Sequence, residues 1–117
     1  MKSIILATTI ALLTASLPLV AGAATFLHKT AAHTAEAGEL ILADTSGGTW
    51  ILTLPASPSQ GHMIQVFDYA GSFATNNLTV DRNGSKIDAT GENLLLDVSG
   101  TKVKLIYINS TQGWRVY

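Results

Sequence analysis

Residues 40–55 read Leu40-Ile41-Leu42-Ala43-Asp44-Thr45-Ser46-Gly47-Gly48-Thr49-Trp50-Ile51-Leu52-Thr53-Leu54-Pro55. Two short apolar segments, 40–44 and 50–54, flank a polar turn whose paired glycines can take positive φ. In the second segment every other residue is large and apolar, so one face of a strand would be buried. Pro55 ends that segment because proline cannot donate a ladder hydrogen bond. The stretch therefore predicts two β-strands joined by a turn.

The same pattern continues to the end of the chain, with a turn signal every 8–15 residues or so. About eight short strands are expected. They cover residues 40–44, 50–54, 63–68, 78–81, a return strand through Ile87, 93–98, 102–108 and 114–117. Asn83-Gly84 is a strong hairpin signal between 78–81 and Ile87. Because no helical period is found from residue 38 onward, we predict an all-β fold: a small antiparallel β-sandwich or jelly-roll-like module, or a small barrel.

Residues 1–24 differ from the rest because they carry one charge, Lys2, whereas the following residues carry 14. An apolar run from Ile4 to Val20 ends in Ala21-Gly22-Ala23-Ala24, which matches a secretory signal peptide 1–23. The alternative is an apolar anchoring arm, since Thr and Pro residues interrupt the run and roughly 17 residues are marginal for a membrane span. The arm residues would be Ile4, Ile5, Leu6, Ile10, Leu12, Leu13 and Leu17. We therefore divide the chain into an arm and connector, 1–33, and a β-rich module, 34–117.

The composition excludes several classes of protein. With 47% hydrophobic and 13% charged residues, the chain is predicted to be ordered. A net charge of −1 argues against nucleic acid as a partner, and the absence of cysteine excludes disulfides and thiolate metal sites. Apolar residues on both faces of several strands indicate further burial, which self-association would supply.

No catalytic or metal-binding constellation is found in the sequence. His28, His33 and His62 lack the spacing and companions of a metal site, although one histidine repeated around a trimer axis could bind an ion. Carboxylates stand mainly at strand ends and beside glycines, where they make turn hydrogen bonds. These residues are Asp44, Asp68, Asp81, Asp88, Glu92 and Asp97. We therefore predict a protein that is not an enzyme and that uses no cofactor or metal.

Three aromatic residues are candidates for glycan contact. Tyr69, Phe73 and Trp114 lie in or next to predicted loops, near Asp and Asn residues. An aromatic ring beside polar groups can stack on a sugar. The alternative is that these rings cover the core or a subunit interface.

Several segments, in order, also carry a family resemblance. They are Ala37-Gly38-Glu39-Leu40-Ile41-Leu42-Ala43-Asp44-Thr45-Ser46-Gly47-Gly48, Leu52-Thr53-Leu54-Pro55-Ala56-Ser57-Pro58, Gly61, Ala74-Thr75-Asn76-Asn77-Leu78-Thr79-Val80, Arg82-Asn83-Gly84-Ser85, Glu92-Asn93-Leu94 and Gly113-Trp114-Arg115-Val116. Residues 34–117 thereby resemble the C-terminal β-rich module of tailed-bacteriophage tail-fibre and virion decoration proteins. The resemblance implies a β-rich, usually trimeric module without catalysis.

The module here follows a short arm rather than a long fibre. The resemblance therefore implies a virion structural protein: a short fibre, head decoration or tail appendage. Residues 1–33 would attach to capsid or tail proteins, and the homotrimeric module would stabilise the particle or contact host-surface glycans. The alternative is a secreted or periplasmic bacterial or prophage-derived carbohydrate or adhesion module with a cleaved signal peptide.

Overall fold

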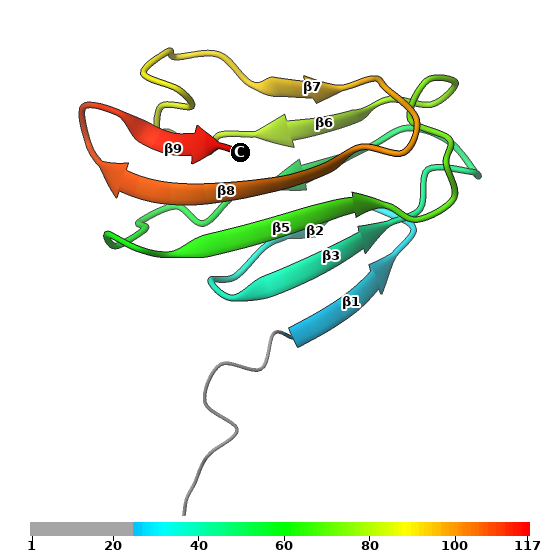
Figure 1. The fold of residues 1–117 in the computed structure, drawn as a ribbon, viewed down its shortest axis with the longest axis horizontal. Helices are drawn as coiled ribbons and strands as arrows, with labels where there is room; N and C mark the ends of the chain where they lie inside the picture. The colour runs from blue at the N-terminus through cyan, green and yellow to red at the C-terminus, as the bar shows by residue number, and fades with distance from the viewer. Residues whose placement is uncertain (1–24) are drawn as a thin grey trace, which may run out of the picture.

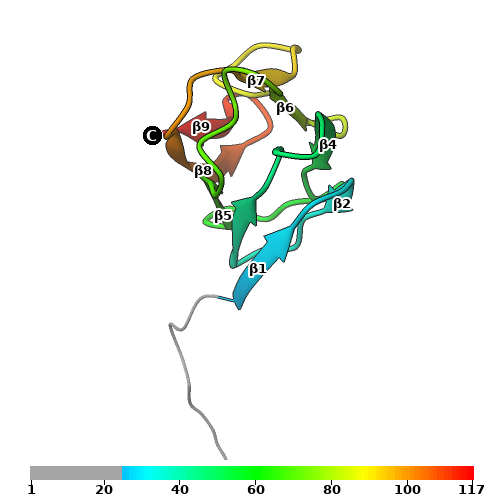
Figure 2. The ribbon, with the colours of Figure 1, turned by 90° about the vertical axis from the view of Figure 1, so that its right-hand side faces the viewer.

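The computed structural model describes residues 25–117, which form two facing β-sheets (Figure 1). The nine strands are β1 (Thr25–Lys29), β2 (His33–Thr34), β3 (Glu39–Ala43), β4 (Trp50–Thr53), β5 (Met63–Asp68), β6 (Leu78–Asp81), β7 (Leu94–Leu96), β8 (Lys102–Asn109) and β9 (Gly113–Val116). One sheet has the order β1-β3-β5-β8-β9 and the other β2-β4-β6-β7. Figure 2 shows β5, β8 and β9 on one side of the fold and β4, β6 and β7 on the other. The predicted small all-β fold is confirmed.

The chain winds as a coil through its first six strands. Consecutive strands enter alternate sheets, and each of the pairs β1–β3, β3–β5, β2–β4 and β4–β6 is parallel. Strands β7, β8 and β9 then add in antiparallel orientation. The sheets are therefore mixed rather than antiparallel throughout. Alternation of side chains has the same period in both kinds of sheet, so the sequence pattern does not distinguish them.

The expected hairpin at Asn83-Gly84 is wrong, although its turn forms. The Asp81 carboxylate accepts a hydrogen bond from the Asn83 N–H (2.8 Å), and Asn83 takes a positive φ of 49°. Ile87 makes only isolated bridges, to Thr90 and Trp114, and β7 is the antiparallel partner of β6. The Asn83 side chain donates instead to the Leu54 carbonyl (3.0 Å), which ties the turn to the end of β4.

Strands β1 and β2 lie where the sequence suggested a connector. Thr25–Lys29 pairs with all of β3, from Thr25 opposite Glu39 to Lys29 opposite Ala43. Leu27 packs against the core, whereas the neighbouring Phe26 is exposed. The predicted anchoring-arm residues lie outside the described part of the chain.

The core fills the space between the two sheets. Its completely buried side chains include Ile41, Ala43, Leu52, Leu54, Ile64, Val66, Phe73, Leu78, Val80, Leu105 and Trp114. Burying a large apolar side chain stabilises a fold by about 1.5–3 kcal/mol. On β5, Ile64 and Val66 point into this core, so the residues between them point outward. The residues that alternate with the core residues therefore form the outer face of each sheet.

Asp68 joins three segments at one end of the five-stranded sheet. Its carboxylate accepts hydrogen bonds from the backbone N–H groups of Ser72 (3.1 Å), Phe73 (3.2 Å) and Gly100 (2.9 Å). The first two lie in the crossover between β5 and β6, and the third precedes β8. The carboxylate thereby fixes the crossover that carries Phe73 into the core.

Gly113 is required where β9 passes the loop after β6. Its φ is +72°, and a Cβ added there would lie 1.9 Å from the Lys86 carbonyl oxygen. The Trp114 N–H donates to that same carbonyl (2.8 Å), so the two segments cannot separate without losing the bond. A side chain at position 113 would therefore strain both segments.

Gly113→Ala is expected to lower the free energy of unfolding by about 3–5 kcal/mol, from the unfavourable φ and the clash. Urea unfolding of the full chain measures the loss. Gly47→Ala is the matched control, because a Cβ there meets nothing within 4 Å. Equal stability of the two variants would contradict the close approach.

Asp68→Asn is expected to lower the free energy of unfolding by about 2–4 kcal/mol, because an amide cannot accept all three bonds and loses their charge assistance. Asp97→Asn is the control, since that side chain is exposed. The same unfolding measurement compares them. A loss below about 0.5 kcal/mol in the Asp68 variant, the range of ordinary surface changes, would show that the carboxylate does not hold the crossover.

Candidate functional site

Two of the three predicted glycan-contact residues are buried. Phe73 and Trp114 have 0% exposed surface, so neither ring can stack on a sugar. Trp114 instead packs edge-on against Tyr107, with ring centroids 5.6 Å apart. The prediction is corrected for both residues, because their loops and strand direct large apolar side chains into a small core.

Tyr69 is exposed, with 56% of its surface accessible. It follows the last residue of β5, and its ring lies against the His28 imidazole at a centroid distance of 4.2 Å. The His28 Nε2 atom is 3.2 Å from Asp44 Oδ2. Tyr69 therefore lies in a polar and aromatic group at one end of the five-stranded sheet, and its glycan contact stays a prediction.

The outer side of the five-stranded sheet gathers aromatic, apolar and basic side chains. The strand register places these side chains next to one another. Phe26 on β1 is opposite Leu40 on β3. On β5, Gln65 is opposite both Leu40 and Lys104, and Phe67 is opposite both Leu42 and Lys102. We call this side the aromatic–basic face. Its residues are Phe26, His28, Leu40, Leu42, Met63, Gln65, Phe67, Tyr69, Lys102, Lys104, Ile106, Arg115 and Tyr117.

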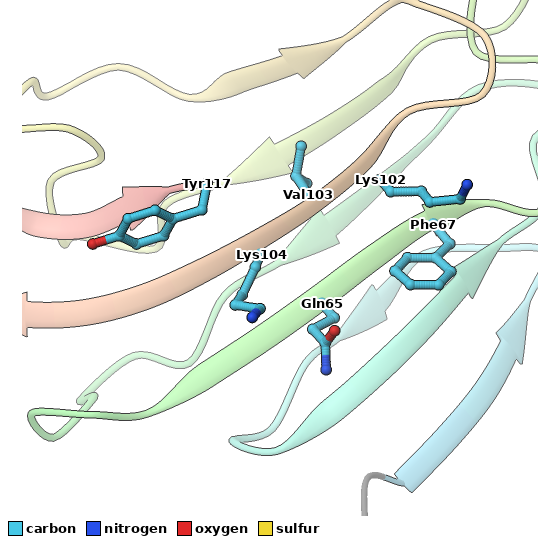
Figure 3. A pocket seen from close by; sticks show the side chains of 6 residues that line it. All are labelled: Gln65, Phe67, Lys102, Val103, Lys104 and Tyr117. Carbon is cyan, nitrogen blue, oxygen red and sulfur yellow. The ribbon is translucent and has the colours of Figure 1, made fainter.

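A shallow groove of about 280 Å³ crosses this face over β5, β8 and the end of β9. Its lining residues are Gln65, Phe67, Lys102, Val103, Lys104 and Tyr117. Figure 3 shows Gln65 and Phe67 on β5 beside Lys104 and Lys102 on β8. Tyr117 pairs with Lys104 through two backbone hydrogen bonds, of 2.8 and 3.1 Å. The groove thus combines two rings, an amide and two ammonium groups.

The lysines of the groove are not engaged by other charged groups of the described chain. The ion pairs within residues 25–117 are His28–Asp44, His33–Glu39 and Arg115–Asp88. Lys102 and Lys104 are exposed and belong to none of them. Their ammonium groups remain accessible to a ligand.

Both histidine–carboxylate pairs join the first turn of the coil to the second. His28 on β1 contacts Asp44, which follows β3, and His33 on β2 contacts Glu39 on β3, with an Nε2–Oε1 distance of 3.0 Å. Hydrogen bonds from the Ser46 hydroxyl (2.6 Å) and backbone N–H (3.0 Å), together with His28, lower the pKa of Asp44. These carboxylates position strands and turns.

The proposed turn role of the aspartates is confirmed at three positions. Asp44 accepts from Ser46, Asp68 from Ser72 and Asp81 from Asn83.

In residues 25–117, no three or more His, Cys, Asp or Glu side chains gather closely enough to hold a metal ion. Over the same residues, no helix has the length and apolarity to cross a membrane.

Comparison by sequence finds no family model that matches the chain and no matching curated protein.

Sequence reasoning missed most of the groove, although part of the signal was present. Alternation places Gln65 and Phe67 on one face of their strand, and Lys102 and Lys104 on one face of theirs. What the sequence lacked was the pairing of these two strands and their register. The position of Tyr117 beside Lys104 depends on the same information.

The lowered pKa of Asp44 predicts a pH dependence of stability. A carboxylate with a folded pKa below its ordinary 3.8 stabilises the fold above that pH, and the contribution is lost as pH falls through the folded pKa. Unfolding of wild type and Asp44→Asn should therefore differ most at neutral pH and converge below pH 3.8. A difference that grows on acidification would contradict this assignment.

Proposed function

We propose that the protein is a non-catalytic virion structural protein of a bacteriophage: a short fibre, head decoration or tail appendage that displays an adhesive β-module. The observation that supports it best is the aromatic–basic face, which presents accessible rings and polar groups on a rigid sheet. The family resemblance of residues 34–117 supplies the virion setting. The module would contact host-surface glycans while its self-association and attachment stabilise the particle.

The adhesive part of the proposal is supported by the chemistry of the face. Phe26, Tyr69 and Tyr117 are all more than half exposed, at 67%, 56% and 68%. Aromatic rings present an apolar surface to the C–H faces of sugars, and neighbouring amide and ammonium groups bond to hydroxyls. Tyr69 and Tyr117 directly follow β5 and β9, whereas Gln65, Phe67, Lys102 and Lys104 lie on the paired strands β5 and β8. Side chains on paired strands are held more rigidly than those on loops, which lowers the entropic cost of binding.

The self-association part is supported by the opposite side of the fold. Ile51 on β4, Thr79 on β6 and Leu95 on β7 are aligned in register on the outer side of the four-stranded sheet. Ile51 is 48% and Leu95 51% exposed, and the row carries no charge. An uncharged apolar row of this kind suits a subunit contact. We propose a homotrimer, which leaves the aromatic–basic face outward.

Attachment is assigned to the segment that precedes the module. The attachment segment predicted as residues 1–33 is limited here to residues 1–24, because Thr25–Lys29 forms β1, an edge strand of the five-stranded sheet. In the proposed role this segment binds a capsid or tail protein. The alternative secreted module would lose residues 1–23, so the intact mass of native protein separates the two. A mass that begins at Met1 supports attachment, and one that begins at Ala24 contradicts it.

Light scattering of the full chain should give the mass of a trimer. Ile51→Ser combined with Leu95→Ser should shift the protein toward monomer, because the apolar row becomes polar. Phe26→Ser is the control, since this exposed residue lies on the other sheet and should leave the trimer intact. A wild type that stays monomeric, or a trimer unaffected by the double change, would contradict the proposed contact.

A further inference from the structure

We propose that the groove on the aromatic–basic face binds an acidic saccharide unit, one that carries a carboxylate or phosphate. This inference rests on the proposed adhesive function and names its ligand class. The groove would stack the sugar ring on Phe67, hold its anionic group with Lys102 and Lys104, and bond to hydroxyls through Gln65. Tyr117 would border the sugar at the other end.

The strand register brings these groups within reach of one sugar. Phe67 is directly opposite Lys102, and Gln65 is directly opposite Lys104, in the antiparallel β5–β8 pair. Opposite Cβ atoms in such a pair lie about 4.5–5.5 Å apart, and residues two apart on one strand lie about 7 Å apart. A sugar ring over Phe67 therefore has an ammonium group on the adjacent strand beside it, with an amide one step further along.

The electrostatics favour an anion over a neutral sugar. Both lysines are exposed and form no ion pair within residues 25–117. On the neighbouring strand β9, Arg115 is paired with Asp88 (2.9 Å). The Asp88 carboxylate is therefore already engaged by another basic residue. Asp68, although it ends β5, directs its carboxylate to the backbone of Ser72, Phe73 and Gly100. The groove therefore offers two ammonium groups that have no ion-pair partner within residues 25–117.

The dimensions favour one sugar unit of a longer chain. A groove of about 280 Å³ is smaller than typical drug-sized pockets and is open along the face. A single site of this kind would bind weakly, and copies on a trimer would raise the apparent affinity through multivalency. An acidic surface polysaccharide, which repeats its charged unit, is the ligand that this arrangement fits.

Titration calorimetry with the full chain tests the inference. The probes are oligogalacturonate, a phosphorylated oligosaccharide and neutral oligogalactose. We expect binding to at least one acidic probe, at least tenfold tighter than to the neutral one, and weakened by added salt. The carboxylate and phosphate probes together distinguish the two sources of charge.

Three variants assign the binding to the groove. Combined Lys102→Gln and Lys104→Gln should weaken acidic-probe binding at least tenfold, and Phe67→Leu should weaken it while keeping the fold, which thermal unfolding checks. Lys86→Gln, at another exposed lysine, should change nothing. Equal loss in Lys86→Gln and the double variant would overturn the inference, because it indicates non-specific charge attraction.

The outcomes separate this inference from the proposed function. A wild type that binds neutral glycans as well as acidic ones overturns the acidic ligand and leaves adhesion supported. A wild type that binds neither these probes nor any glycan of a broad array overturns the acidic ligand and the adhesive function together.

Discussion

The fold depends on one constraint: consecutive strands from β1 to β6 must fill a shared core from opposite sides. Because β1 to β6 enter the two sheets alternately, every turn of the coil contributes an inward row from each sheet. Ile64 and Val66 supply that row on β5, and Leu52 supplies it on β4. The residues that alternate with these buried ones point outward, whether they are polar or apolar. The aromatic–basic face follows from this geometry, since Gln65 and Phe67 occupy outward positions.

Carboxylates and lysines have different roles in this molecule. Asp44, Asp68 and Asp81 are committed to backbone groups at strand ends, where they hold the crossovers between sheets. Lys102 and Lys104 lie on β8, directly opposite Phe67 and Gln65 of β5, and their side chains form no ion pair within the described chain. Arg82 and Arg115 also make structural contacts, to the Ser85 carbonyl and to Asp88, so Lys102 and Lys104 are the basic residues that we propose for ligand binding.

The sequence predicted local features better than long-range ones. Strands near 40–44, 50–54, 63–68 and 78–81 were expected from alternation and turn residues, and the structure contains them. Parallel pairing was not predictable, because a turn such as 45–48 looks the same whether the chain returns along its own sheet or crosses to the other. β1 and β2 lack strong alternation and gain their structure from neighbouring strands. The burial of Phe73 and Trp114 likewise depends on tertiary contacts, from Asp68 and from the approach of β9 to Lys86.

We propose that the aromatic–basic face is the ligand-binding surface of the protein. Backbone amide chemical-shift mapping of the full chain, titrated with an oligosaccharide that it binds, tests this most directly. If this face binds the ligand, saturable shifts are expected mainly at Gln65, Phe67, Lys102, Lys104 and Tyr117, with little change along the row of Ile51, Thr79 and Leu95. Shifts concentrated on the four-stranded sheet, with the groove unchanged, would contradict it.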